Sequence, residues 1–426
     1  MSEHIETIAI HAGYEPKNSE PRALPVYQST TYHYSSVDEV AGLFDLSVEG
    51  HMYSRISNPT CDAVERKIAA MEGGVGAVLT TSGQAATLVA VLNLCSSGDH
   101  LVSSATIYGG TVNLLAVTLK RMGIEVTFVS PRATVDEIRA AFKPNTKLVF
   151  GETIANPALA VLDLEAFAEA AHAEGVPFIV DNTFPTPVMC RPFEWGADIV
   201  VHSTTKYMDG HAMFVGGVVV DSGNFDWDAH ASKFPGLTEP DESYHGIVYT
   251  RDFGKAAYIT KARVQLIRDL GVYPPAVAAF ALNQSLESLS FRMRQHCGNA
   301  QRVAEWLEAQ PQVESVNFPG LASSPDHDLA AKYLPKGTCG VISFVVAGGR
   351  DRAAALLDAM ELASIEVHVA DSRTCVLHPA SATHRQLTDE QLVACGVEPG
   401  MVRFSCGLED AEDIIADLEQ AFAKLG

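Results

Sequence analysis

The sequence predicts an α/β protein with a mostly parallel central sheet, followed by a smaller C-terminal α+β domain. Three observations support this prediction. Short apolar runs alternate with helical stretches between residues 76 and 220, as expected for parallel strands covered on both faces. The 426 residues are enough for two or three domains at roughly 150 residues each. A composition of 47% hydrophobic and 19% charged residues is that of a globular chain.

The N-terminal segment, residues 1–57, is polar and irregular, with five tyrosines and no sustained periodicity. A segment of this kind rarely folds into a domain by itself. We therefore expect an N-terminal arm that contacts a neighbouring subunit.

A large domain is expected over residues 58–285. Its first helix is predicted at Pro59–Met71, because Asn58 suits the N-cap, Pro59 suits the first helical position and Gly73 can end the helix. Another helix is predicted at Leu164–Ala173. The predicted strands are Gly76–Leu79, His100–Ser103, Val126–Val129, Lys147–Phe150, Phe178–Val180, Ile199–Val201 and Gly217–Val220.

Residues 221–250 interrupt this alternation with Gly, Pro, Asp and aromatic residues, which indicates an insertion or a functional loop. One long helix is then predicted at Pro275–Ala309, where leucines recur at helical spacing. A smaller domain is expected over residues 286–426. Its predicted elements are strands at Gly340–Val346 and Val402–Ser405 and helices at Arg352–Met360 and Ala411–Leu425.

Charge and cysteine content exclude several classes of function. The net charge of −22 disfavours binding to nucleic acid or to anionic lipid. The eight cysteines form no C-x-x-C pair, so we expect reduced thiols and no metal site. The first residues contain acids where a secretory signal has basic residues, which favours the cytoplasm.

Two charged residues follow neighbouring predicted strands. Asp181, in VDNTF, ends an apolar strand, and Lys206, in VHSTTKY, follows another strand 25 residues later. Because ligands bind outside the carboxyl ends of parallel strands, both side chains can reach one crevice. An acid in this position also suits magnesium or ribose binding, and a lone lysine is commonly a solvated surface charge.

The neighbouring residues favour a phosphate site. Ser203 and Thr205 flank Lys206 with hydroxyls, and Gly83 and Gln84 begin a helical stretch whose N-terminal N–H groups can bind an anion. The dinucleotide fingerprint and the P-loop motif are both absent from the sequence, which disfavours a dehydrogenase or an ATPase.

A phosphate cradle, an acid and a lysine are the groups that pyridoxal 5′-phosphate requires. The lysine forms a Schiff base with the aldehyde, and the carboxylate keeps the pyridine nitrogen protonated. Tyr108 follows the strand predicted at His100–Ser103, where an aromatic side chain can stack on the ring.

The chain resembles the Cys/Met-metabolism enzymes that depend on pyridoxal phosphate, the trans-sulfuration family. The resemblance covers nearly the whole chain. It rests on the segments YSRISNPT from Tyr53, TSGQAA from Thr81, IYGGT from Ile107, ANP from Ala155, VDNTF from Val180, VHSTTKY from Val201, HPASATHRQL from His378 and VRFSCGLED from Val402.

The resemblance implies a fold-type I transferase and a role for each matching residue. Lys206 corresponds to the Schiff-base lysine, Asp181 to the partner of the ring nitrogen and Tyr108 to the stacking and catalytic tyrosine. The phosphate ligands would be Ser203, Thr205, Gly83 and Gln84, joined by Tyr53 and Arg55 of a neighbouring subunit.

The resemblance also implies substrate-binding residues. Arg403 would bind the substrate α-carboxylate with help from Asn156, because a guanidinium suits a carboxylate bidentately. His368 stands where a small polar residue is expected, and its role is left open.

Within the family, the chain most resembles the O-acetylhomoserine sulfhydrylases, in its length, in the insertion and in ADSRT before HPASATHRQL. This implies γ-replacement of acetate by sulfide to form L-homocysteine in methionine biosynthesis, by a cytoplasmic homotetramer built of dimers with shared sites. The alternatives are methionine γ-lyase, cystathionine γ-synthase or γ-lyase, O-succinylhomoserine sulfhydrylase and a catalytically silent regulatory protein.

Overall fold

A computed structural model describes residues 4–382, 385, 388 and 398–426. The described chain divides into two compact units. The first consists of residues 1–153, 163–209 and 213–288, and the second of residues 154–162, 210–212 and 289–426. The cofactor-type residues predicted from the sequence lie in the first unit, and Asn156 and Arg403 lie in the second.

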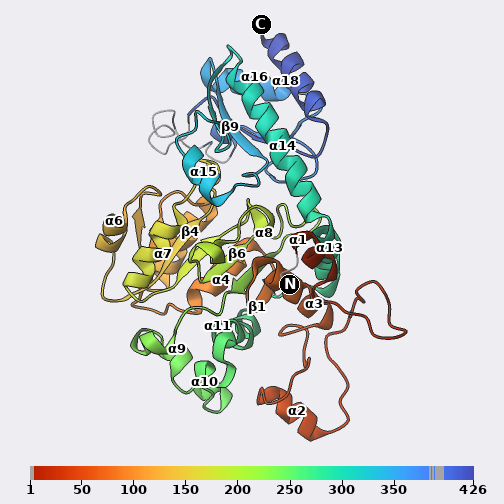
Figure 1. Cartoon of the computed structure of the whole chain (residues 1–426), viewed down its shortest axis with the longest axis vertical. Helices are drawn as coiled ribbons and strands as arrows, with labels where there is room; N and C mark the ends of the chain where they lie inside the picture. Colours follow the sequence, from red (N-terminus) through yellow and green to blue (C-terminus); the bar gives the residue numbers. More distant parts are fainter. Residues whose placement is uncertain (1–3, 383–384, 386–387, 389–397) are drawn as a thin grey trace. The chain divides into compact units, whose positions relative to one another are not determined.

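The first unit is built on a seven-stranded sheet in the order β1-β7-β6-β5-β4-β2-β3 (Figure 1). Only β7 is antiparallel to its neighbours β1 and β6, so the expected mostly parallel sheet is confirmed. The strands are β1 Gly76–Thr80, β2 His100–Ser104, β3 Glu125–Val129, β4 Thr146–Glu152, β5 Phe178–Asp181, β6 Ile199–His202 and β7 Gly217–Asp221. The central residues of every strand except the edge strand β3 are buried, which explains why these strands are apolar without alternation.

Helices connect and cover these strands. Those around the sheet are α3 Pro59–Glu72, α4 Gly83–Leu92, α5 Gly109–Asn113, α6 Val135–Ala140, α7 Leu164–Ala173, α8 Thr186–Met189, α11 Ala257–Lys261, α12 Arg268–Leu270 and α13 Ala276–Glu287. The expected end signals of α3 act as predicted, since Asn58 accepts a hydrogen bond from the Thr60 N–H and Gly73 adopts a left-handed conformation with φ of 83°. Two π-helical segments, Leu114–Leu119 and Ala262–Ile267, extend α5 and α11.

The N-terminal arm contains two helices that the sequence did not predict, α1 Ile5–His11 and α2 Val37–Phe44. The Ser36 side chain caps α2 by accepting a hydrogen bond from the Glu39 N–H. The rest of the arm is extended, and Thr31 forms an isolated antiparallel bridge with Tyr53.

The segment at 221–250 folds into short helices and an aromatic cluster. Trp227 stacks on Tyr258 with a centroid distance of 5.7 Å and an interplanar angle of 6°, and Phe234 packs edge-on against Trp227. The helices are α9 Pro235–Thr238 and α10 Tyr249–Phe253, with 3₁₀ turns at Asp228–Lys233 and Glu242–Tyr244. This segment therefore contributes to the core through buried aromatic side chains.

The long helix predicted at Pro275–Ala309 is wrong in one respect, because it is two helices. α13 ends at Glu287, and α14 Leu289–Glu308 begins after Ser288, which has φ of −104° and ψ of 2°. The Ser288 hydroxyl donates to the Ser285 carbonyl, so the last turn is closed locally instead of continuing into α14. The leucines on the two sides are all buried, which explains why their spacing is continuous.

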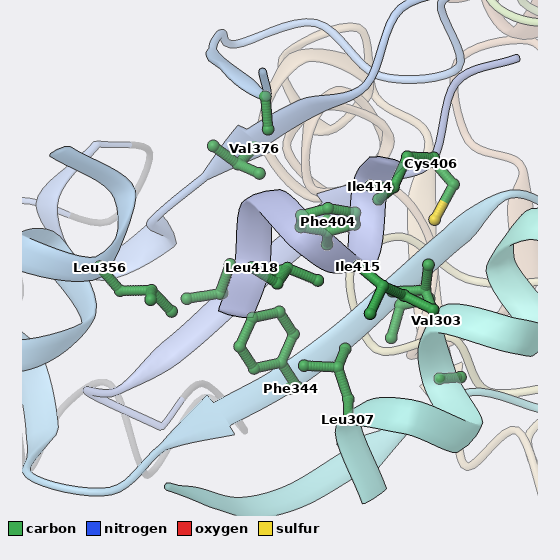
Figure 2. Close-up of a cluster of buried hydrophobic side chains, with 14 of the residues drawn as sticks. Val303, Leu307, Phe344, Leu356, Val376, Phe404, Cys406, Ile414, Ile415 and Leu418 are labelled. Carbon is green, nitrogen blue, oxygen red and sulfur yellow. The ribbon is translucent and has the colours of Figure 1, made fainter. Parts of the chain in front are cut away.

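The second unit has a five-stranded sheet in the order β10-β11-β12-β9-β8. Its core includes Phe344, Phe404 and Leu418, which lie together between the sheet and the helices in Figure 2. The strands are β8 Val313–Asn317, β9 Val341–Val346, β10 Ser364–Ile365, β11 Cys375–Leu377 and β12 Met401–Ser405, and the other helices are α15 His327–Tyr333, α16 Gly349–Ala359 and α18 Ala411–Leu425.

Within the described part of the chain, no helix has both the length and the apolar character that crossing a membrane requires. The seven described cysteines are all buried free thiols.

Candidate active site

Asp181 and Lys206 follow the carboxyl ends of two adjacent parallel strands. Asp181 is the last residue of β5 and pairs in register with Val201 of β6. Lys206 lies in the turn after β6, where its N–H donates to the Ser203 carbonyl at 3.3 Å. Both residues are half-buried. The structure therefore positions the acid and the amine at the same edge of the sheet, as the sequence predicted.

The Asp181 carboxylate is oriented through one of its oxygens. Oδ1 accepts hydrogen bonds from the N–H of Thr183, at 3.0 Å, and from the Thr183 hydroxyl. Among the described residues no donor is bonded to Oδ2, which leaves this oxygen for another partner. Burial raises the pKa of Asp181, while the Thr183 hydroxyl and the positive charge of His202 oppose that rise.

The beginning of α4 is in contact with the turn that carries Lys206. The Ser82 side chain caps the helix by accepting from the Ala85 N–H at 3.0 Å. The first N–H groups of a helix lack an intrahelical acceptor, so those of Gly83 and Gln84 can bind an anion. A Cβ on Gly83 would lie 2.6 Å from the Cβ of Ser203, and only glycine permits this approach.

The backbone of Tyr108 is bound by a buried carboxyl group, that of Glu152. Its N–H donates to Oε2 of Glu152 at 2.6 Å, and its side chain is 48% exposed. A Cβ on Gly110 would lie 2.5 Å from both Gln84 Nε2 and Tyr108 Cε1, so the tyrosine ring and the start of α4 are neighbours.

Glu152 and Asp181 face each other in register on β4 and β5. Burial raises the pKa of Glu152 well above its usual range, and the charge of Asp181 raises it further. Two adjacent buried carboxyls do not readily carry two negative charges. Glu152 is therefore the member of this pair that favours the neutral form.

These contacts link the residues of the site in a ring that begins and ends at Tyr108. Tyr108 is bonded to Glu152, Glu152 is paired with Asp181, and Asp181 accepts from Thr183. The Thr183 hydroxyl accepts from the Ser203 N–H at 2.9 Å, Ser203 contacts Gly83, and Gly83 precedes Gln84 beside Tyr108. Tyr108, Asp181, Ser203, Gly83 and Gln84 are thus linked to one another, and Lys206 lies three residues after Ser203.

Thr205 and the two arm residues, Tyr53 and Arg55, are not part of this ring of contacts. The Thr205 hydroxyl accepts from the Gly216 N–H at 3.0 Å and donates to the Gly216 carbonyl at 3.2 Å. Arg55 is exposed, donates to the Arg268 carbonyl and lies 5.5 Å from the centroid of the Tyr53 ring. Within one described chain, neither Tyr53 nor Arg55 forms a hydrogen bond with a residue of that ring of contacts.

In the second unit, the segment with Asn156 is attached to the strand pair that carries Arg403. Ser343 of β9 pairs with Arg403 of β12, and the Ser343 hydroxyl donates to the Pro157 carbonyl at 2.9 Å. Nη2 of Arg403 donates to the carbonyls of Val367 and His368 at 3.0 and 3.1 Å, which orients the buried guanidinium. Oδ1 of Asn156 is buried without a hydrogen-bond donor among the described residues.

The His368 side chain lies against an acid of its own loop, with Nε2 3.9 Å from Oδ2 of Asp371. Its carbonyl accepts from Arg403 and from the Cys375 thiol. The backbone of His368 thus orients Arg403.

Comparison with known proteins identifies the family. The model of the Cys/Met metabolism pyridoxal-phosphate-dependent enzymes matches residues 6–423. The chain belongs to this family. Its fold, its status as an enzyme and its dependence on pyridoxal phosphate follow from that membership.

Two curated relatives and one solved structure are similar over almost their whole length. The chain is 42% identical to O-acetyl-L-homoserine sulfhydrylase of Leptospira meyeri, covering 99% of this chain and 97% of the relative. It is 45% identical to homocysteine synthase of Schizosaccharomyces pombe, with coverages of 99% and 98%. A Campylobacter jejuni structure with the provisional name O-acetylhomoserine (thiol)-lyase superposes with a TM-score of 0.94 at 35% identity, covering 99% and 100% of the two chains.

That structure contains N′-pyridoxyl-lysine-5′-monophosphate, in which a lysine is joined to the cofactor. The residues of this chain fit the same cofactor. The close approach of Gly83 to Ser203 forms a cradle that a side chain would fill, and the helix N–H groups suit a phosphate. Oδ2 of Asp181 can accept from a protonated ring nitrogen, and Tyr108 offers an exposed ring.

Sequence reasoning missed two residues that support the predicted ones. Glu152 ends β4 and binds the backbone of Tyr108, and Thr183 holds Asp181. Both could have been suspected, because Glu152 is an acid after an apolar strand and Thr183 is part of VDNTF. Their partners depend on tertiary contacts that no local pattern contains.

Proposed function

We propose that this protein catalyses γ-replacement, converting O-acetyl-L-homoserine and sulfide into L-homocysteine and acetate in methionine biosynthesis. The observation that carries the proposal is the 42–45% identity, over nearly full length, to relatives named O-acetyl-L-homoserine sulfhydrylase and homocysteine synthase. In the reaction a Cγ–O bond breaks and a Cγ–S bond forms. Acetate leaves with the electron pair of the Cγ–O bond, and no oxidant or reductant is consumed.

The proposed roles of the site residues follow from their chemistry. When bound, pyridoxal phosphate supplies an aldehyde that captures amines and a ring that accepts electron density. Lys206 holds the cofactor covalently and, once its amine is released, moves protons at Cα and Cβ of the substrate. Asp181 accepts a hydrogen bond from the ring nitrogen, and Tyr108 stacks on the ring.

The remaining residues bind the phosphate and the substrate. Gly83, Gln84, Ser203 and Thr205 bind the phosphate through N–H and hydroxyl groups, joined by Tyr53 and Arg55 of a neighbouring subunit. Arg403 binds the α-carboxylate of the amino-acid substrate, and Asn156 assists it.

Three coarser features belong to the same proposal. The protein acts as a homotetramer of dimers with shared sites, and its N-terminal arm, residues 1–57, reaches the neighbouring subunit. Residues 58–285 form the cofactor-binding domain and residues 286–426 the small domain. The compartment is the cytoplasm, in keeping with seven buried cysteines that are all free thiols.

A side-by-side assay on one preparation tests the function. We expect homocysteine from O-acetylhomoserine and sulfide to form faster than from O-succinylhomoserine, and faster than 2-oxobutanoate is released from methionine or cystathionine. The Tyr108-Gly109-Gly110-Thr111 segment has glycine where methionine γ-lyases usually have cysteine, which disfavours methionine γ-lyase, although synthases and cystathionine lyases also have glycine there. Dominant 2-oxobutanoate from methionine would assign the protein to the lyases.

A further inference from the structure

A buried acid–histidine pair lies next to Asp181. Glu72 is the last residue of α3, and His202 is the last residue of β6. Oε1 of Glu72 lies 2.6 Å from Nε2 of His202, and both side chains are fully buried. Burying two ionisable groups costs free energy that their mutual attraction does not fully return. A pair of this kind therefore calls for an explanation beyond stability.

Glu72 also holds the residue that follows Asp181. Nδ2 of Asn182 donates to Oε1 of Glu72 at 3.3 Å and to the Cys190 carbonyl at 2.9 Å. Oδ1 of Asn182 accepts from the Thr153 hydroxyl at 3.0 Å. One carboxylate oxygen is thus bonded both to the end of β6 and to the residue after β5, the two strands whose ends carry the site.

The electrostatic effect of the pair on Asp181 has a definite sign. Positive charge on His202 stabilises the carboxylate form of Asp181, against the effect of burial. Nε2 of His202 lies 2.6 Å from Oε1 of Glu72, so Glu72 fixes the position of the imidazole relative to Asp181. The other ionisable groups around Asp181 and Glu72 include Glu152, which favours its neutral form, and the buried thiol of Cys190, neither of which supplies positive charge.

We propose that Glu72 is a positioning residue for the cofactor, which fixes the orientation and the negative charge of Asp181 through Asn182 and His202. The inference rests on the proposed contact between Asp181 and the ring nitrogen. Glu72 therefore connects the end of β6 to the residue after Asp181 through two hydrogen bonds to one carboxylate oxygen.

Glu72→Gln tests the proposal because it removes the charge and keeps the size and Oε1 of the side chain. The measurement is the Kd of pyridoxal phosphate for the apoprotein, by titration of absorbance, together with kcat and KM of the holoenzyme. We expect Kd to rise by about tenfold, which corresponds to about 1.4 kcal/mol of binding free energy. We expect kcat to fall with little change in KM, and Glu72→Asp, which keeps the charge, to recover part of the affinity.

Glu65→Gln is the matched control. Glu65 lies on the same helix, is equally buried, and is bonded to Arg263 and to the Leu79 N–H instead of to the residues around Asp181. This variant should lose thermal stability without losing cofactor affinity. If Glu72→Gln also lowers only the melting temperature and leaves Kd unchanged, Glu72 is purely structural and the proposal is overturned.

A second variant keeps the proposal testable if Glu72→Gln does not fold. His202→Gln removes the imidazole charge and leaves the bond between Asn182 and Glu72, and we expect the same rise in Kd. An unchanged Kd in this variant contradicts the electrostatic part of the proposal. The wild-type protein in the same experiment distinguishes failure of the proposed function from failure of the role proposed for Glu72. A wild type that binds pyridoxal phosphate but does not use O-acetylhomoserine refutes only the proposed function.

Discussion

Lys206 has the most specific chemistry of any residue in the site. If its amine forms the covalent bond to pyridoxal phosphate, Lys206→Ala abolishes that bond and nearly all turnover, while Asp181 and the phosphate cradle remain. Borohydride reduction followed by mass spectrometry of the peptides checks this directly, since reduction fixes the cofactor on lysine in the wild type. A cofactor that can still be fixed by reduction in the variant would refute the assignment.

Asp221 provides a second test at the residue scale, away from the site. Its side chain is buried, Oδ1 accepts from the Gly223 N–H at 2.9 Å, and Oδ2 has no donor among the described residues. Burial raises its pKa to about 7. A carboxyl whose folded pKa is raised binds its proton more tightly when folded, so its contribution to stability is complete below about pH 4 and is lost as the pH rises through 7.

Asp221→Asn removes this titration and keeps the acceptor for Gly223. The free energy of unfolding gained by the variant over the wild type should therefore be larger at pH 8 than at pH 5, by about 2.7 kcal/mol, because the wild-type penalty grows over about two pH units at about 1.36 kcal/mol each. Urea unfolding at the two pH values measures it. An equal difference at both pH values would show that Asp221 is ionised in the folded protein across this range.

At the scale of elements, α4 lies so close to the turn after β6 that Gly83 leaves no room for a side chain. An added Cβ at Gly83 would lie 2.6 Å from Ser203 Cβ and 2.9 Å from its Cα. Gly83→Ala therefore forces the two parts of the cradle apart, and a misfit of this kind costs about 1–3 kcal/mol. We expect the Kd of pyridoxal phosphate to rise accordingly.

Gly298→Ala is the control for this substitution. Gly298 lies inside α14, where an added Cβ meets nothing within 4 Å. Alanine there should stabilise the helix by about 1 kcal/mol and leave the Kd unchanged. The same titration on both variants decides whether the contact with Ser203 matters, and an unchanged Kd in Gly83→Ala would contradict it.

The elements that the sequence predicted well are those with a local cause. All seven strands of the first sheet were expected within two residues at each end, and in all but the edge strand β3 burial makes the central residues continuously apolar. The helix at Leu164–Ala173 was predicted to the residue, with Asp163 as its N-cap. Local patterns did not reveal the break at Ser288 or the short strands β10 and β11, whose boundaries depend on tertiary pairing.

The residues of the site also fall into two groups, those that a local pattern reveals and those that only the structure reveals. Lys206 and Asp181 were found because they follow apolar strands, a pattern visible in one dimension. The bond from Tyr108 to Glu152 and the one from His202 to Glu72 join residues 44 and 130 positions apart, so no sequence window contains them. Motif residues could thus be named from the sequence, whereas the residues that orient them required the structure.

At the scale of the whole molecule, the arm determines whether one chain is sufficient for activity. Tyr53 and Arg55 are exposed, and Arg55 is bonded to the backbone of Arg268 of its own chain. The side chains predicted to bind phosphate in a neighbouring subunit are therefore exposed in the described chain. If each site combines Lys206 of one subunit with Arg55 of another, activity belongs to the oligomer.

Mixing two inactive variants tests this. Arg55→Ala chains retain Lys206, and Lys206→Ala chains retain Arg55, so in a hybrid dimer one of the two sites contains both residues. Random pairing of equal amounts makes half of the dimers hybrids, and we expect about a quarter of the wild-type activity after unfolding and refolding the variants together. Each variant refolded alone provides the baseline. Verified hybrids without recovered turnover would mean that Arg55 acts on its own chain, because a site shared between subunits would leave one complete site in every mixed dimer.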